Sequence, residues 1–169
     1  MYEYSIAIFR HSLRSLAGLL RKGAAYAAEH HIPPEVLLDV RLAPAMFTLG
    51  EQVRGVSYHA RAAAANLTGE VAPVYDGDRR TFPELLTEID GTLEWLDALP
   101  VSQLAGAEAR EITLELHRGP VRFDGQRYLA HFALPNFFFH LTTAYDILRY
   151  CGVALGKTDF LGDLEGLSR

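Results

Sequence analysis

The segment HFALPNFFFHLTTAY, residues 131–145, belongs to the longest run of the chain without a charged residue, residues 128–145. A run of this length approaches that of a membrane span, yet it contains histidines, a proline, an asparagine and threonines. These polar groups favour a helix buried in a protein core over one buried in lipid. We predict that the helix extends from about Gly125 to Cys151 and that Pro135, which has no backbone N–H to donate, kinks it or leaves a carbonyl without its helical partner.

One face of this predicted helix mixes apolar and polar side chains at spacings of three and four: Leu129, Phe132, Asn136, His140, Thr143 and Ile147. The apolar members turn this face inward, so Asn136 and His140 point to the interior one turn apart, with Thr143 below them. A buried amide or imidazole without a partner costs about 1–3 kcal/mol. The face therefore indicates either a satisfied core network that fixes helix register or a polar spot in a pocket between helices.

Three segments upstream also repeat with a helical period. They cover about residues 3–29, about residues 44–67, and a stretch that begins at the capping box Thr81–Glu84. Residues 34–38 predict a single helical turn, and the alternation within residues 111–124 predicts a β-hairpin. Four long helices, with a hairpin before the last one, predict an all-α four-helix bundle in a single domain, residues 1–169.

The composition excludes several classes of protein. Sixteen Lys and Arg against 21 Asp and Glu give a net charge of −5 without a basic cluster, so we expect no nucleic-acid partner. The single cysteine, Cys151, excludes an intramolecular disulfide and is typical of a reducing compartment. Charged residues from Glu3 to Arg14 interrupt the first apolar run, so we predict no secretory signal, no membrane partner and a cytoplasmic location.

The candidate site residues lie on the last helix and on the segment predicted to face it. Asn136 and His140 supply two polar groups, and a metal ion needs three or four ligands. We therefore favour a site without metal, built around these two residues and lined by Thr143, Tyr58, His59, Gln52, Met46 and Phe139. His140 suits the role of polar anchor or general acid/base, because small environmental shifts move its charge across neutral pH. We assign to Asn136 the role of orienting it.

Three stretches resemble one bacterial and fungal family: RLAPAMF (41–47), the segment 131–145, and GVALGKTDFL (152–161). The family is the domain of unknown function numbered nineteen-ninety-three, within the DinB-like superfamily, and the resemblance covers essentially the whole chain. It implies a DinB-like four-helix bundle with a small β-hairpin before the last helix, assembled as a homodimer.

The resemblance also implies a possible metal site. Many DinB-like relatives bind a divalent metal through three histidines, and some use it for thiol-dependent transferase or isomerase chemistry. On this chain the ligand positions of the last helix fall on Asn136 and His140. The third falls near Ala45 and Met46, where Ala45 has no donor atom.

The sequence is compatible with three functions. We favour a protein that binds or transforms a small apolar or aromatic molecule in a pocket between helices, without metal. The first alternative is a thiol transferase or isomerase that depends on Zn, Ni, Mn or Fe, with His140 and Asn136 as ligands. The second alternative is a dimeric interaction protein without catalytic activity.

Overall fold

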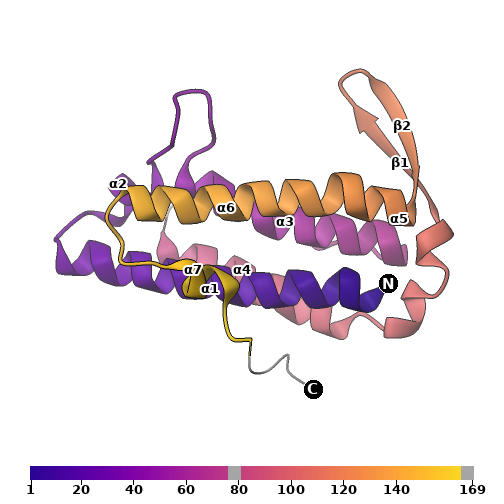
Figure 1. The fold of residues 1–169 in the computed structure, drawn as a ribbon, viewed down its shortest axis with the longest axis horizontal. Coiled ribbons are helices and arrows are strands. Elements are labelled where there is room, and N and C mark those ends of the chain that lie inside the picture. Colours follow the sequence, from indigo (N-terminus) through magenta and orange to yellow (C-terminus); the bar gives the residue numbers. More distant parts are fainter. Residues whose placement is uncertain (76–80, 165–169) are drawn as a thin grey trace.

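Long helices lie side by side in two pairs, α1 with α4 and α3 with α6, in a computed structural model that describes residues 1–75 and 81–164 (Figure 1). The helices are α1 (Ile6–Glu29), α2 (Pro34–Leu38), α3 (Leu49–Thr68), α4 (Phe82–Ala98), α5 (Gly125–Tyr128), α6 (Leu134–Tyr150) and α7 (Lys157–Leu161). Strands β1 (Glu111–Leu116) and β2 (Gly119–Asp124) form an antiparallel hairpin before α5. The predicted all-α bundle with a hairpin before its last long helix is confirmed.

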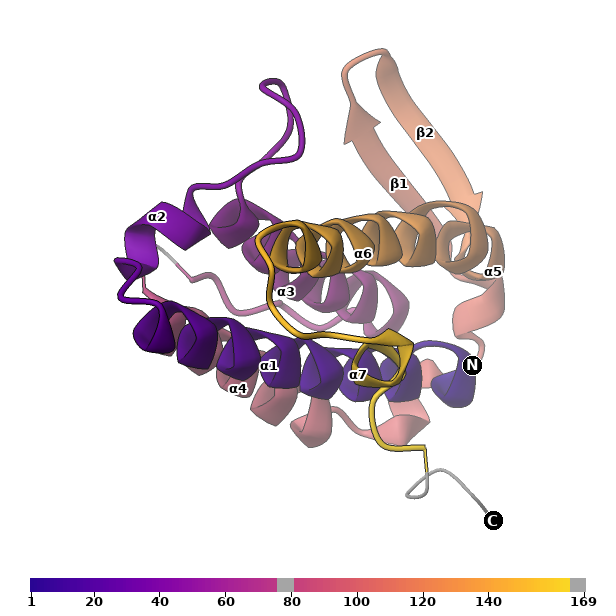
Figure 2. The same cartoon turned by 60° about the vertical axis from the view of Figure 1, so that its left-hand side comes forward.

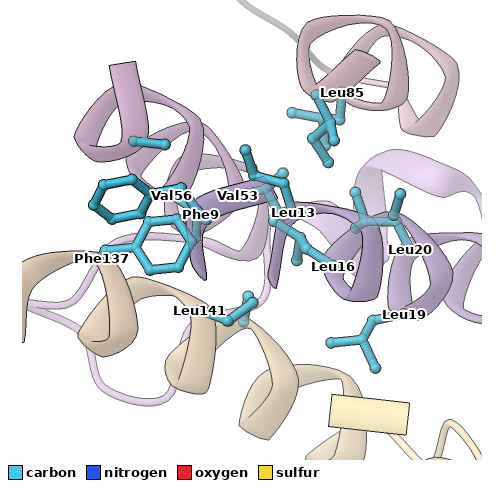
Figure 3. Packing of buried hydrophobic residues seen from close by; sticks show 14 of the residues in the cluster. Phe9, Leu13, Leu16, Leu19, Leu20, Val53, Val56, Leu85, Phe137 and Leu141 are labelled. Atoms are coloured by element: carbon cyan, nitrogen blue, oxygen red, sulfur yellow. The ribbon is translucent and has the colours of Figure 1, made fainter. Parts of the chain in front are cut away.

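The core fills the space between the two helix pairs. Apolar stripes of α1, α3, α4 and α6 meet there, as the spacing of three and four predicted. Phe9 of α1 and Phe137 of α6 contact edge to face at 4.9 Å, and Leu16 and Leu141 lie beside them (Figure 3). No helix within residues 1–75 and 81–164 is both long and apolar enough to cross a membrane.

Helix α3 begins five residues later than the sequence pattern suggested, so the predicted start at Pro44 is wrong. The Thr48 hydroxyl accepts the Glu51 N–H at 3.3 Å, and the Glu51 carboxylate accepts the Thr48 N–H at 2.7 Å. This reciprocal capping box fixes Thr48 as the residue before the helix. Met46 consequently lies in the preceding loop. The same device begins α4 at Thr81, as predicted.

The last long helix is continuous from α5 to α6 but contains a π-helical segment, Leu129–Ala133, just before Pro135. A wider turn accommodates a proline that cannot donate a hydrogen bond. The side chain of Asn136 donates to the Phe132 carbonyl at 2.7 Å and so satisfies a backbone acceptor of this turn. The turn also changes the helical phase, so the predicted face does not continue unbroken from Leu129 to His140.

The hairpin projects away from the helices (Figures 1 and 2), and α7 packs against α1. The turn of the hairpin holds two residues, His117 and Arg118. Helix α7 was not predicted as a helix. It is attached to α1 by an ion pair of 2.6 Å between Lys22 and Asp159 and by a 2.6 Å hydrogen bond between His11 and the Leu161 carbonyl.

Candidate functional site

A cleft of about 510 Å³ opens between α3, α6 and the segment 72–75 that follows α3. Side chains of α3 form one wall, and the segment 72–75 forms another. Phe47, Glu88 and His140 complete the lining. The lining thus combines aromatic and aliphatic side chains with charged groups and two histidines.

Gln52 fixes the tautomer of the neutral His140 ring. The Gln52 amide, 1% exposed, donates through Nε2 to the Phe47 carbonyl at 3.3 Å, and its Oε1 lies 2.7 Å from Nδ1 of His140. A carbonyl only accepts, so the amide nitrogen must face Phe47 and the amide oxygen must face His140. Nδ1 therefore carries the proton in the neutral ring, and Nε2 is an acceptor. Nε2 has no hydrogen-bond partner in the described part of the chain.

The imidazole of His140 is held within a stack of rings. Phe47 lies on one face with ring centroids 6.0 Å apart, and His59 lies nearly parallel to it at 5.1 Å. The ring also approaches α3 at Gly55, where a Cβ atom would lie 2.9 Å from Cγ and Nδ1 of His140. Only a glycine at this position leaves room for the ring where it stands.

Both histidines of the stack resist protonation. Burial lowers the pKa of His59 to about 4, and repulsion from His140 adds to the effect. Burial also lowers the pKa of His140 below its usual range. At neutral pH both rings are therefore uncharged, and the Nε2 lone pair of His140 is available to a ligand.

This behaviour predicts acid sensitivity. An unfolded histidine titrates near 6.5 and folded His59 near 4, so between these values the unfolded state binds more protons. Stability is full above about pH 6.5 and falls as the pH drops toward 4. One proton bound only by the unfolded state gives a slope of at most about 1.4 kcal/mol per pH unit, and the partial exposure of His59 reduces the total loss. Melting temperatures at pH 7 and pH 4.5 should differ less in H59Q than in the unchanged protein. The exposed-site variant H131Q is the control, and an equal acid effect in H59Q would contradict the assignment.

A buried ion pair, Arg61 with Glu88, also lines the cleft. Both Nη atoms of Arg61 lie 3.4 Å from Oε1 of Glu88, and Nη1 donates to the Thr92 hydroxyl at 2.8 Å. Arg61 is 6% and Glu88 is 3% exposed. The Tyr75 ring covers the guanidinium at 4.4 Å, and its hydroxyl occupies the space where a side chain at Gly91 would lie. The pair thus anchors the segment 72–75 against α3 and α4.

The residues present do not fit the three-histidine metal site that the resemblance implies. Ala45 is exposed and has no donor, and the amide of Asn136 is engaged with a backbone carbonyl. His59 and His140 are the only two histidines in the described lining of the cleft, so the third histidine of such a site is missing there. No group of three His, Cys, Asp or Glu able to hold a metal occurs among the residues described.

The structure brings together five of the residues singled out from the sequence. His140, His59 and Tyr58 line the cleft, and Gln52 supports His140 from behind. Phe139 contacts the His140 ring edge to face at 5.5 Å and is 57% exposed. The helical spacing correctly indicated that these positions of α3 and α6 face one another.

The other three residues lie outside the cleft lining. Asn136 contacts the Phe132 carbonyl, so the residue that orients His140 is Gln52 and not Asn136. Thr143 is buried, and its hydroxyl donates to the Phe139 carbonyl at 2.7 Å. Met46 precedes α3, where its carbonyl accepts from Arg41.

Sequence reasoning missed Phe47, Gly55, Tyr75 and the pair Arg61–Glu88. Two signals were present in the sequence. A glycine inside a helix lowers helix stability by up to about 1 kcal/mol, so Gly55 indicated a close approach. Arg61 lies one residue from the apolar stripe of α3, at Ala60, but its partner on α4 comes 27 residues later, beyond the reach of a local pattern.

Comparison with solved structures defines the class of protein. The chain is similar to a DinB family member protein from Shewanella denitrificans, whose crystal structure superposes with a TM-score of 0.89 at 33% sequence identity. The match covers 96% of this chain and 92% of the other. The fold is therefore that of the DinB-like helical bundles.

The family follows from the sequence itself. The model of the domain of unknown function DUF1993 matches residues 1–161, and the chain belongs to this family. A search among curated proteins returned no match. The resemblance stated from the segments 41–47, 131–145 and 152–161 is confirmed.

Proposed function

We propose that the cleft binds a small, partly apolar organic molecule and that Nε2 of His140 accepts a hydrogen bond or a proton from it. The observation that carries this proposal is the chain of contacts from the Phe47 carbonyl through Gln52 to Nδ1 of His140. It sets the tautomer in advance, so the ligand meets an oriented acceptor. A core histidine would also need a partner, but here only Nδ1 has one among the described residues, and Nε2 is left unpaired in a ring that lines the cleft.

The chemistry of the site supports general-base rather than general-acid behaviour. The pKa of His140 lies below its usual range, so the ring is unprotonated at neutral pH. A neutral imidazole can take a proton from a ligand whose acidic hydrogen lies within about 3.2 Å. The aromatic rings of Phe47, Tyr58 and Tyr75 provide the apolar walls on which a ring or short chain would pack.

A matched pair of probes tests the proposal. Phenol has a hydroxyl donor for Nε2, whereas anisole has nearly the same shape and no donor. We expect phenol to shift the NMR amide signals of Gly55, His59 and Val74 at lower concentration than anisole does. H140A should remove this preference without unfolding the chain, because His140 lines the cleft and is not enclosed on all sides by the core.

The control is N136A, which removes an inward-facing polar group of the same helix that does not contact His140. It should lose about 0.5–1.5 kcal/mol of stability with the bond to Phe132 and keep the preference for phenol. If H140A binds phenol and anisole as the unchanged protein does, the proposal fails. It also fails if H140A unfolds, because His140 then serves the core alone.

A further inference from the structure

Arg54 of α3 lines the cleft without a partner for its charge. Its side chain is half-buried and makes no hydrogen bond or ion pair with any residue in the described ranges 1–75 and 81–164. A guanidinium is planar and offers several N–H donors to an anionic acceptor. The guanidinium of Arg54 can therefore bind an anionic group of a molecule in the cleft.

The other charged groups of the cleft already have partners. Glu88 interacts with Arg61, which also has Thr92 and the Tyr75 ring. The Glu51 carboxylate accepts the Thr48 N–H at the start of α3. Burial lowers the pKa of Arg61, and repulsion from the positive charge of Arg54 makes a smaller contribution in the same direction. The two histidines are neutral, and Glu51, which keeps its negative charge, forms no ion pair with Arg54 among the described residues.

We infer that the molecule bound in this cleft is an organic carboxylate with an aromatic or short apolar body, and that Arg54 binds its carboxylate. This inference rests on the proposed function and adds the class of the ligand. A guanidinium offers two parallel N–H groups that match one carboxylate, and one unpaired charge matches a monoanion better than a phosphate dianion. His140 then accepts from a donor elsewhere on the same molecule.

The apolar lining sets the character of the ligand between these two ends. Phe47, Tyr58 and Val74 line the cleft, and 54%, 60% and 80% of their respective surfaces are exposed. Such exposed apolar groups lose contact with water when a ring or short chain covers them. The walls thus bind the body of the ligand, while Arg54 and His140 bind its polar groups.

Two probes of similar shape, one charged and one neutral, test the inference. 4-Hydroxybenzoate and 4-hydroxybenzamide share the phenol donor for His140, and only the first is an anion. By NMR titration we expect the benzoate to bind about tenfold more tightly, as one charge-assisted hydrogen bond of about 1.5 kcal/mol would give. R54Q should abolish this advantage and leave binding of the benzamide unchanged. R122Q, which removes an exposed arginine of β2, makes the same change in net charge and should keep the advantage.

The outcomes separate the inference from the function on which it rests. If both probes bind at the cleft equally and R54Q has no effect, the carboxylate assignment is wrong and the small-molecule site stands. The same conclusion follows if R122Q lowers the affinity for the benzoate as much as R54Q does, because the effect is then one of net charge. If neither probe shifts the cleft residues, the proposed function itself fails.

Discussion

Replacing Glu88 with methionine is expected to lower the free energy of unfolding by about 3–5 kcal/mol, the cost of leaving a buried charge without its counter-ion. Glu88 is the carboxylate that lies 3.4 Å from both Nη atoms of Arg61, and both side chains are more than nine-tenths buried. In E88M the guanidinium keeps only the Thr92 hydroxyl and the Tyr75 ring. Urea unfolding at pH 7 measures the change.

The double variant E88M/R61M distinguishes the charge from the packing. It removes both ions and fills the space with side chains of similar length, so it should recover much of the stability lost in E88M. The control is E94M on the exposed face of α4, which should change stability by no more than about 0.5 kcal/mol. A double variant as unstable as E88M would show that shape, and not an unpaired charge, causes the loss.

Replacing Gly55 with alanine is expected to destabilise the protein by about 1–3 kcal/mol, although alanine is the better helix former. The added methyl group would lie 2.9 Å from two atoms of the His140 ring, which must then move. Movement of the ring breaks its 2.7 Å contact with Gln52 and opens the stack with Phe47 and His59. Binding of phenol at the cleft should be lost in the same variant.

Gly18 of α1 provides the matched control. It also lies inside a helix, and a methyl group there would meet no atom within 4 Å. G18A should therefore stabilise the protein by about 0.5–1 kcal/mol and leave phenol binding unchanged. If G55A stabilises the protein as G18A does, the close approach of α3 and His140 does not constrain the site.

Much of the fold follows from local patterns along the chain. The box Thr81–Glu84 and the turn Pro34–Leu38 lie where capping chemistry and proline place them. The start of α3 could not be predicted in this way. The apolar period continues back to Met46, whereas the capping box makes Thr48 the residue that precedes the helix. Periodicity extends over many residues, but a helix terminus depends on one or two hydrogen bonds.

The site was only partly predictable, for a similar reason. The helical period turned His140 inward and placed Gln52 and His59 on the segment that faces it. It could not show that Gln52 rather than Asn136 holds the ring, since this depends on the packing distance between α3 and α6. Arg54 was not identified from the sequence, because its lack of a partner among the described residues becomes visible only in the folded structure.

The tautomer of His140 shows whether Gln52 orients the ring so that Nε2 can accept from a ligand. A long-range correlation of side-chain nitrogen and carbon-bound hydrogen signals, recorded at pH 7 with nitrogen-15 histidine, separates protonated from unprotonated ring nitrogens. We expect that Nδ1 of His140 carries the proton, that Nε2 does not, and that phenol shifts the Nε2 signal. A ring protonated at Nε2, a charged imidazolium, or an Nε2 signal that phenol leaves unmoved would contradict this expectation.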